Sequence, residues 1–313
     1  MDSDTLEYLE KRLGRVHARL RIGIEEEYFP RVFGKGINFF HPENWYSSHS
    51  LLRKFLKMSG FYWRGRANTL NFRVSRNTIA LSHLPRAFDG FTLLHLSDLH
   101  ADMYPPAMEA MIRRVKDMTY DAVVLTGDYR AWTFGEIEQS MEGMRALCDV
   151  LTGPVYGVLG NHDTIRMVPE LEAMGIRMLL NESVVLTRDG SEIHLAGIDD
   201  AHYYRVDNIE KTADGIPLEA ISILLSHTPE IFRQATHAGF DICFCGHTHG
   251  GQICLPGSVP LTLDARCPRR LGSGAWRYGK MRGYTSAGVG TSIVEVRINC
   301  PPEIALHTLR VGV

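Results

Sequence analysis

The feature of this chain that most constrains its fold is a series of short apolar segments, each followed directly by polar residues. The segments span residues 91–97, 122–126, 155–159, 193–198, 221–226 and 241–245. Their length and continuous apolar character predict strands that are buried on both faces. Stretches of helical periodicity at 105–116 and 134–149 separate the first three segments. Strand–helix–strand units of this kind predict an α/β fold, and the closer spacing of the later segments predicts hairpins.

The size and composition of the chain are typical of one catalytic domain with an extension. The chain has 313 residues, of which 44% are hydrophobic and 22% charged, and its formal net charge is -2. A single core stops growing at roughly 250 to 300 residues, so one large core can account for most of the chain. The balanced charge gives no indication of a nucleic-acid partner. We therefore predict an amphipathic, basic extension at residues 1–88 and a catalytic domain at residues 89–313.

The extension is predicted to contain an amphipathic helix over residues 5–21. Its apolar residues recur at steps of three and four, a period typical of a helix with one buried face; they are Leu6, Leu9, Leu13, Val16 and Leu20. The opposite face is basic and carries Lys11, Arg12, Arg15 and Arg19. Residues 44–88 contain eight basic residues and no acidic one. Within them, residues 45–66 mix bulky apolar and aromatic side chains with arginine and lysine.

Two interpretations of residues 5–66 remain open. A basic, aromatic and amphipathic surface suits the interface of a membrane. The same pattern also fits helices that pack on the catalytic domain and turn a solvated basic face outward. No apolar stretch is long enough for an export signal or a membrane span, and six cysteines without a CxxC pair indicate reduced thiols. We therefore expect a cytoplasmic protein, which in the first interpretation contacts the inner face of the membrane.

Polar side chains of metal-binding type follow five of the predicted strands. They are Asp98 with His100, Asp128, Asn161 with His162 and Asp163, His227, and His247 with His249. In open α/β sheets, ligand sites form where the strands end. Positions 98 and 100, like 247 and 249, are two residues apart, so an extended backbone projects both side chains to one side. Carboxylate, imidazole and amide donors without a thiolate favour divalent Mn, Fe, Zn or Co.

The order of these residues resembles that of the calcineurin-like metallophosphoesterases. The shared motifs are D-L-H at 98–100, G-D at 127–128, G-N-H-D at 160–163, S-H at 226–227 and G-H-T-H-G-G at 246–251. The resemblance extends over residues 91 to about 310. It implies a four-layer αββα sandwich, in which helices flank two facing mixed sheets. It also implies a phosphoester hydrolase with two divalent metal ions per chain, Mn²⁺ being the first candidate and Zn²⁺, Fe²⁺ and Co²⁺ the others.

The resemblance assigns a role to each motif residue. It implies that the first ion is bound by Asp98, His100, Asp128 and His249, and the second by Asp128, Asn161, His227 and His247. A bridging carboxylate at Asp128 partly neutralises two cations about 3.5 to 4 Å apart, and a water that bridges them, its pKa lowered toward about 7, attacks phosphorus in line. His162 is the motif histidine that the family does not use as a ligand. By resemblance it faces the substrate and either protonates the leaving oxygen or stabilises charge on phosphorus, and Asp163 orients and charges its ring.

A narrower resemblance concerns the substrate. The segments G-I-D-D at 197–200, L-S-H-T-P-E at 225–230 and N-C-P-P-E at 299–303 resemble a bacterial branch of membrane-associated phosphoesterases that includes UDP-2,3-diacylglucosamine pyrophosphatases. This implies a lipid-linked phosphodiester or pyrophosphate as substrate. Side chains near the motifs that could contact it are Arg130, Arg166, His202 and Tyr203. Two alternatives stay open: a nuclease or cyclic-nucleotide phosphodiesterase, and a metal-bearing scaffold without catalysis.

Overall fold

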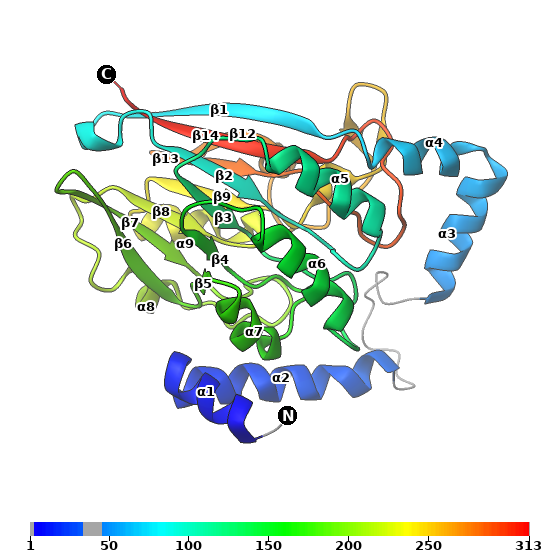
Figure 1. Cartoon of the computed structure of the whole chain (residues 1–313), viewed down its shortest axis with the longest axis horizontal. Coiled ribbons are helices and arrows are strands. Elements are labelled where there is room, and N and C mark those ends of the chain that lie inside the picture. The colour runs from blue at the N-terminus through cyan, green and yellow to red at the C-terminus, as the bar shows by residue number, and fades with distance from the viewer. Residues whose placement is uncertain (1–2, 34–45, 313) are drawn as a thin grey trace.

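The computed structural model describes residues 3–33 and 46–312, which form two six-stranded mixed sheets packed face to face between helices (Figure 1). In sheet order, the first sheet contains β1 (Arg73–Leu81), β14 (Glu303–Val311), β2 (Thr92–Leu96), β3 (Ala122–Leu125), β4 (Val155–Gly157) and β5 (Ile176–Met178). The second contains β12 (Gly274–Tyr278), β13 (Met281–Thr285), β9 (Ile242–Cys245), β8 (Ser222–Leu225), β7 (Ser191–Gly197) and β6 (Glu182–Arg188). A small ribbon consists of β10 (Cys254–Leu255) and β11 (Val259–Pro260). The predicted architecture of two mixed sheets flanked by helices is confirmed.

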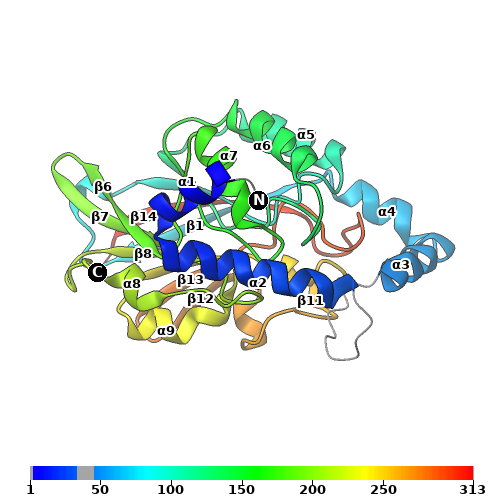
Figure 2. The ribbon, with the colours of Figure 1, turned by 90° about the horizontal axis from the view of Figure 1, so that it is seen from below.

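Some of the helices cover the two outer faces of the sheets, and the others lie at their ends. They are α1 (Ser3–Leu13), α2 (Arg15–Phe33), α3 (Tyr46–Met58), α4 (Phe61–Asn68), α5 (Pro105–Val115), α6 (Glu138–Cys148), α7 (Val168–Ala173), α8 (Ile209–Ala213) and α9 (Phe232–His237). Short 3-10 turns occur at Arg86–Phe88, Ile165–Met167, Pro229–Ile231, His249–Gly251 and Arg269–Leu271. Figure 2 shows α5, α6 and α7 on one side of the sheets and α8 and α9 on the other, with α2 running across one end.

The apolar segments form strands because both of their faces are buried. Leu93 and Val124 on the first sheet meet Leu195, Ile223 and Phe244 on the second in one cluster between the sheets, and all five are fully buried. Strands β2, β3, β4 and β5 run parallel, as do β7, β8, β9 and β13. Since the carboxyl ends of parallel strands lie at the same edge of a sheet, the polar segments that follow them are brought together.

The helix predicted over residues 5–21 is divided into two. Gly14 separates α1 from α2 with a φ of 89°, a left-handed conformation that glycine adopts readily and that ends a helix. The break changes which side chains face the protein. Leu9 is fully buried, whereas Val16 and Leu20, predicted on the same face, are 75% and 51% exposed.

Helices α1 and α2 pack on the catalytic domain, in agreement with the second interpretation of this region. Leu9 and Ile22 belong to the apolar cluster that includes the first sheet. Arg12, on the face predicted to be a solvated basic surface, forms ion pairs with Glu172 at 3.0 Å and Glu182 at 2.7 Å. The described side chains of these two helices thus pack on the catalytic domain, as the second interpretation expects.

The domain boundary drawn from the sequence placed the first strand, β1, in the extension, but this strand is part of the first sheet. β1 pairs with β14 along its whole length, from Arg73 beside Glu303 to Leu81 beside Val311. Residues 73–81 thus belong to the first sheet, although the boundary at residue 88 placed them in the extension. Arg73, one of the eight basic residues that suggested an extension, pairs with the buried carboxylate of Glu303 at 2.8 Å.

Among residues 3–33 and 46–312, no helix is both long and apolar enough to cross a membrane. All six cysteines lie within these residues as free thiols. Trp45, which the sequence analysis included in the basic and aromatic segment, lies outside the described residues.

The packing of α1 is tested by truncating one of its buried side chains. Leu9→Ala is expected to lower the free energy of unfolding by about 2 to 5 kcal/mol, because it removes a fully buried leucine and leaves a cavity. Urea unfolding followed by circular dichroism measures the change. Val16→Ala, at an exposed position of the same predicted face, is expected to stay within about 0.5 kcal/mol of the parent. Equal effects of the two substitutions would show that α1 does not dock as described.

Candidate metal centre

The loops after β2, β3, β4, β8 and β9 converge at one edge of the two sheets and bring together all seven predicted metal ligands. The donor atoms form two groups, in each of which they lie within 4.8 Å of one another; the groups are Asp98, His100 and His249, and Asp128, His227 and His247. Asn161 joins the second group, since its Oδ1 lies 2.9 Å from His227 Nε2. Every one of these residues is buried. Side chains separated by up to about half the chain therefore share one site.

The backbone at this site is held in a conformation that non-glycine residues rarely adopt. Five of the seven predicted ligands have a positive φ: Asp98 (52°), His100 (39°), Asp128 (57°), His247 (73°) and His249 (50°). Such conformations cost roughly 1 to 3 kcal/mol each and persist where the surrounding structure enforces them. They turn the chain sharply as it leaves each strand, so that the side chains point back into the gap between the sheets.

Two glycines allow the loops to approach one another. A Cβ at Gly160 would lie 2.2 Å from Asp128 Oδ1, and a Cβ at Gly246 would lie 1.7 Å from Ser97 Oγ. No side chain fits at either position, so the motif glycines are required by the close packing of the ligand loops.

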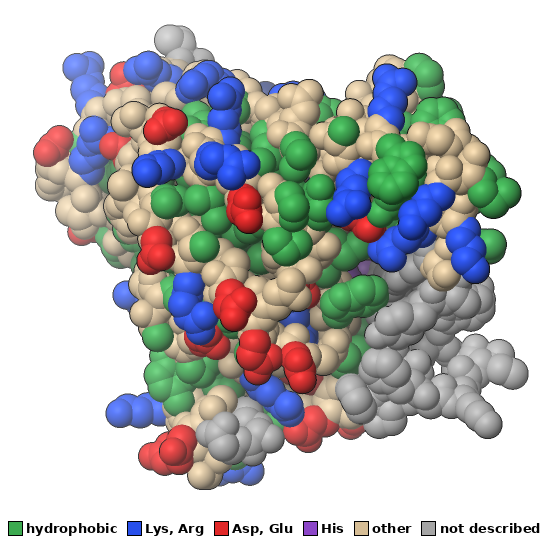
Figure 3. Space-filling model, turned by 45° about the vertical axis from the view of Figure 1, so that its right-hand side comes forward, with side chains coloured by type: hydrophobic (Ala, Val, Ile, Leu, Met, Phe, Trp, Pro, Cys, Tyr) green, Lys and Arg blue, Asp and Glu red, His purple; other side chains and the backbone are tan. Residues whose placement is uncertain are grey.

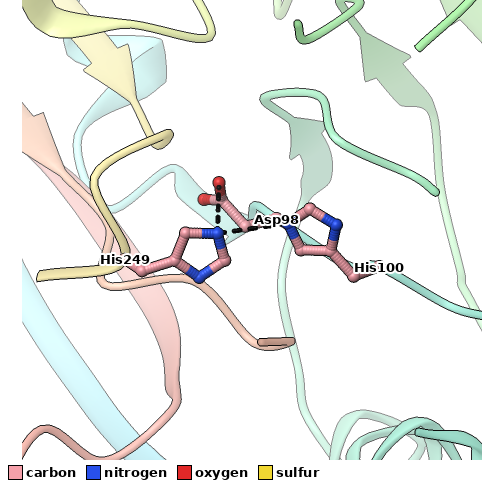
Figure 4. Close-up of side chains that lie close together, drawn as sticks. All are labelled: Asp98, His100 and His249. Atoms are coloured by element: carbon pink, nitrogen blue, oxygen red, sulfur yellow. Dashed lines mark hydrogen bonds and ion pairs between the residues drawn. The ribbon is translucent and has the colours of Figure 1, made fainter. Parts of the chain in front are cut away.

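In the first group, three donor atoms face one another. His100 Nε2 lies 3.1 Å from His249 Nε2, which lies 3.4 Å from Asp98 Oδ1 (Figure 4). His100 Nδ1 lies 2.9 Å from the carbonyl oxygen of Arg130. A ring that donates its Nδ1 proton to this carbonyl keeps the lone pair of Nε2 for a cation. Burial also lowers the pKa of His100 to about 3, so the ring is neutral at neutral pH.

In the second group, a backbone carbonyl oxygen again lies beside the Nδ1 of a histidine ring. His227 Nδ1 lies 2.7 Å from the carbonyl oxygen of Thr126, which fixes the ring and leaves Nε2 facing the centre. His227 Nε2 lies 3.2 Å from His247 Nδ1. Burial lowers the pKa of His247 well below its usual range, so this ring is also neutral.

The Asp128 carboxylate lies between the two groups. Its Oδ2 is 3.2 Å from His227 Nε2 and 3.8 Å from His100 Nε2. Burial lowers the pKa of His227, but the nearby carboxylates of Asp128 and Asp98 outweigh burial and raise that pKa to about 10. Their effect shows that the electrostatic potential favours positive charge here. Buried carboxylate oxygens, neutral imidazoles and an amide oxygen around two centres fit two divalent cations.

His162 lies at the edge of this centre. Its Nε2 is 4.0 Å from Asp128 Oδ2, and its Nδ1 is 3.2 Å from Thr133 Oγ1. The Asp163 carboxylate makes different contacts from those expected. It accepts the backbone N–H groups of Asp128, Tyr129 and Gly160, each at 2.8 Å, and none of its hydrogen bonds goes to the His162 ring. Asp163 therefore shapes the loops that carry the ligands, and Thr133 contacts the His162 ring.

The four candidate substrate contacts differ in their surroundings. The Arg130 guanidinium is buried and donates to the carbonyl oxygens of His162, Thr133 and Gly135. Tyr203 is buried against Tyr28, and partly exposed Arg166 pairs with Glu26 at 3.0 Å. His202 is the candidate whose side chain packs on a predicted ligand: its ring centre is 4.2 Å from that of His247, and its Nδ1 is 3.0 Å from Glu230 Oε1.

Sequence reasoning missed some residues that support the site. Fully buried Arg297 donates to the carbonyl oxygens of His249 at 3.1 Å and Gly290 at 2.6 Å and so holds the segment after β9. Arg21 and Glu25 on α2 contact the loop after β4. No motif marks these side chains, because they come from segments distant in sequence. For Arg297, the one available signal was its place in V-E-V-R-I, where charged and apolar residues alternate.

A cavity of about 390 Å³ opens directly onto the metal centre. One wall contains Asp128, Asn161 and His162. The lining also has an apolar part, which includes Leu52, Phe55 and Leu56 of α3 together with Ile253, Leu261, Ile293 and Val294. A phosphate at the metal ligands would therefore have a large apolar surface beside it.

Comparison with known proteins agrees with this geometry. A family model described as calcineurin-like phosphoesterase matches residues 91–251, just over half of the 313 residues. The uncharacterized metallophosphoesterase YkoQ of Bacillus subtilis (strain 168) is 29% identical over 80% of this chain and 94% of its own length. The phosphodiesterase YaeI of Escherichia coli (strain K12) is 28% identical over 70% of this chain and 82% of its own length. The UDP-2,3-diacylglucosamine pyrophosphatase LpxG of Chlamydia muridarum (strain MoPn / Nigg) is 23% identical over 71% of this chain and 85% of its own length. The chain therefore belongs to the calcineurin-like phosphoesterases and is a phosphoester hydrolase.

Proposed function

We propose that this protein hydrolyses a phosphodiester or pyrophosphate bond in a lipid-linked substrate, of which UDP-2,3-diacylglucosamine is the leading example, with two Mn²⁺ ions at the candidate metal centre. The observation that carries the proposal is the cavity that is lined both by predicted ligands and by an apolar wall to which α3 contributes. The name of LpxG, a distant relative, agrees with a substrate of this class.

In the proposed mechanism, Asp98, His100, Asp128 and His249 hold one ion, and Asp128, Asn161, His227 and His247 hold the other. When bound, the two ions activate a water molecule and neutralise the charge that develops on the phosphoryl oxygens. The protein positions the phosphate between the two ligand groups and excludes bulk water by its burial. His162, whose Nδ1 meets the Thr133 hydroxyl at 3.2 Å, presents Nε2 toward the centre and protonates the leaving oxygen.

The apolar wall continues onto an exposed surface that suits a membrane. One face of α3 and α4 is anchored, since Leu56 and Tyr62 pack on Val294 and Val296. The other face exposes large apolar side chains, namely Leu51 (70%), Phe55 (65%), Met58 (87%), Phe61 (50%) and Trp63 (63%). Exposed Lys54, Lys57 and Arg64 lie among them, and Figure 3 shows green and blue side chains together at the upper right. Apolar area and basic charge both favour an anionic lipid surface, and we propose contact with the inner face of the membrane here.

The substrate is tested with one side chain that lines the cavity and is also exposed. Phe55→Asp is expected to raise KM for UDP-2,3-diacylglucosamine in anionic vesicles by about 10-fold or more, because the change removes roughly 1.5 to 3 kcal/mol of apolar contact and adds a charge. Hydrolysis of a small chromogenic phosphodiester should not change. Steady-state kinetics with Mn²⁺ and cosedimentation with the vesicles measure the two effects.

Leu218→Asp is the matched control, since Leu218 is 92% exposed and lies outside the cavity. It should leave both activities and vesicle binding unchanged. Wild-type protein that cleaves the small ester and not the lipid nucleotide would refute the proposed substrate and leave the hydrolase activity established. Affinity for polynucleotides that falls steeply with salt would instead favour the nuclease alternative.

A further inference from the structure

Two long charged side chains of α2 are buried where the helix crosses the end of the sheets. Arg21 is fully buried and Glu25 is 8% exposed. They pair with each other, with 2.9 Å between Arg21 Nε and Glu25 Oε1. Burying such a pair costs several kcal/mol per ion unless further hydrogen bonds satisfy both groups. The partners of this pair therefore indicate what it holds in place.

The pair is bonded to the loop that follows β4. Arg21 Nη2 donates to the carbonyl oxygen of Asp163 at 2.9 Å. The Glu25 carboxylate accepts the backbone N–H of Ile165 at 2.8 Å and also the hydroxyl of Thr164. Three consecutive residues of the loop are thus fixed by one turn of α2.

The residues fixed in this way come directly after Asn161 and His162. At His162 itself, Arg130 Nε donates to the carbonyl oxygen at 2.6 Å. Four consecutive residues of the loop, 162–165, are therefore held by Arg130 and the Arg21–Glu25 pair. Because these contacts restrain the backbone, they help to set the directions of the Asn161 amide and the His162 ring.

Arg21 also contacts the loop that follows β7. Its Nη1 lies 3.7 Å from Asp199 Oδ1, and its guanidinium lies 3.5 Å from the centre of the Tyr204 ring. This second loop carries His202, whose ring packs against that of His247. One arginine thus connects two loops that come from different sheets, and each loop carries a residue that contacts or belongs to the candidate metal centre.

We propose that Arg21 and Glu25 are positioning residues for hydrolysis, through which α2 sets the placement of Asn161 and His162. The proposal rests on the hydrolase activity and is independent of the lipid-linked substrate. In this account the N-terminal helices are part of the catalytic apparatus and not only a cover for the core. A displacement of about 1 Å at a reacting group can lower a rate about 100-fold, so the loss of these contacts should appear in kcat.

The test compares Arg21→Met and Glu25→Ala with Glu25→Gln in the full-length, Mn²⁺-loaded protein. Glutamine keeps the size of Glu25, and its carbonyl oxygen can still accept from Arg21 and Ile165 while its amide donates to the Thr164 hydroxyl. With a small chromogenic phosphodiester, Arg21→Met and Glu25→Ala are expected to lower kcat about 10- to 100-fold with little change in KM. Glu25→Gln is expected to restore most of the rate. In the metal-free protein, hydrogen exchange of residues 160–166 should be faster in the first two variants only.

Arg12→Met is the matched control because it also removes ion pairs from the N-terminal helices, those with Glu172 and Glu182, away from the loop. It should lower the melting temperature and leave kcat unchanged. Wild-type kcat and exchange in folded Arg21→Met and Glu25→Ala, or an equal loss of kcat in Arg12→Met, would overturn the proposal. Thr164→Val removes one contact of Glu25 without altering α2 and decides the question if Arg21→Met does not fold. If the wild type does not hydrolyse the ester, the proposed function fails, and the exchange measurement still decides whether α2 holds the loop.

Discussion

Replacing Asp128 with asparagine is expected to empty both metal sites and to lower kcat/KM by about 10³-fold or more. The side chain is buried, and its Oδ2 faces His227 at 3.2 Å and His100 at 3.8 Å, so it serves both ligand groups. Asparagine keeps the shape and one acceptor oxygen but removes the negative charge that two cations share. Since metal ions contribute several kcal/mol to such reactions and about 1.4 kcal/mol corresponds to tenfold in rate, a loss of this size follows.

Metal content after dialysis, measured by plasma mass spectrometry, tests this directly. The parent is expected to retain about two ions per chain, as dinuclear sites do, and Asp128→Asn none. Asp117→Asn, at an exposed position outside the site, serves as the control and should behave as the parent does. An Asp128→Asn protein that keeps both ions would show that this carboxylate does not bridge them.

His162→Ala is expected to retain both metal ions and to lower kcat by about 10²- to 10⁴-fold, which is the usual contribution of a general acid to the rate. The ring lies at the edge of the centre, 4.0 Å from Asp128 and in contact with Thr133, and its main chain N–H donates to Asp128 Oδ1 at 2.9 Å. The backbone contact survives the substitution, so the ligand carboxylate should stay in place. The combination of full metal content and low kcat separates this role from that of a ligand.

Two measurements complete the test of His162. His237→Ala, at an exposed position on α9, controls for the general loss of an imidazole and should have normal kcat. A substrate with a much better leaving group should reduce the defect of His162→Ala, because such a group needs no proton to depart. Loss of metal from His162→Ala, or a defect that does not depend on the leaving group, is the result that would exclude general-acid catalysis by this residue.

The convergence of the predicted ligands was largely predictable from the sequence, because the pattern that marks each of them is local. Each ligand stands directly after an apolar strand, and parallel strands bring their ends to one edge, so the positions of Asp98 and Asp128 follow from the pattern alone. The positive φ values at the ligands could not be predicted, since the spacing of positions 98 and 100 was attributed to extended backbone. The side chains nevertheless meet, because the loops turn back toward the gap between the sheets.

The main features that the sequence could not predict depend on contacts between residues that are far apart along the chain. The pairing of β1 with β14 was hidden because β1 lies in a segment without acidic residues, and Glu303, the buried partner of Arg73, lies near the other end of the sequence. The division of α1 from α2 depends on one residue, Gly14, within an otherwise regular period. The role of Asp163 was misjudged for a related reason: adjacency to His162 suggested a side-chain contact, whereas the carboxylate satisfies backbone groups of another loop.

The position of β14 between β1 and β2 has a consequence for biosynthesis. Arg73 and Glu303 are neighbours across this pair although they are 230 residues apart in the chain. While the ribosome makes the residues between them, the edge of β2 and the whole of β1 lack their partner strand, and an unpaired strand edge is a site of aggregation. Closure of so long a loop is slow compared with local pairing. The nascent chain should therefore remain sensitive to chaperones until translation has passed β14, even though the ligand loops up to His249 have already left the ribosome by then.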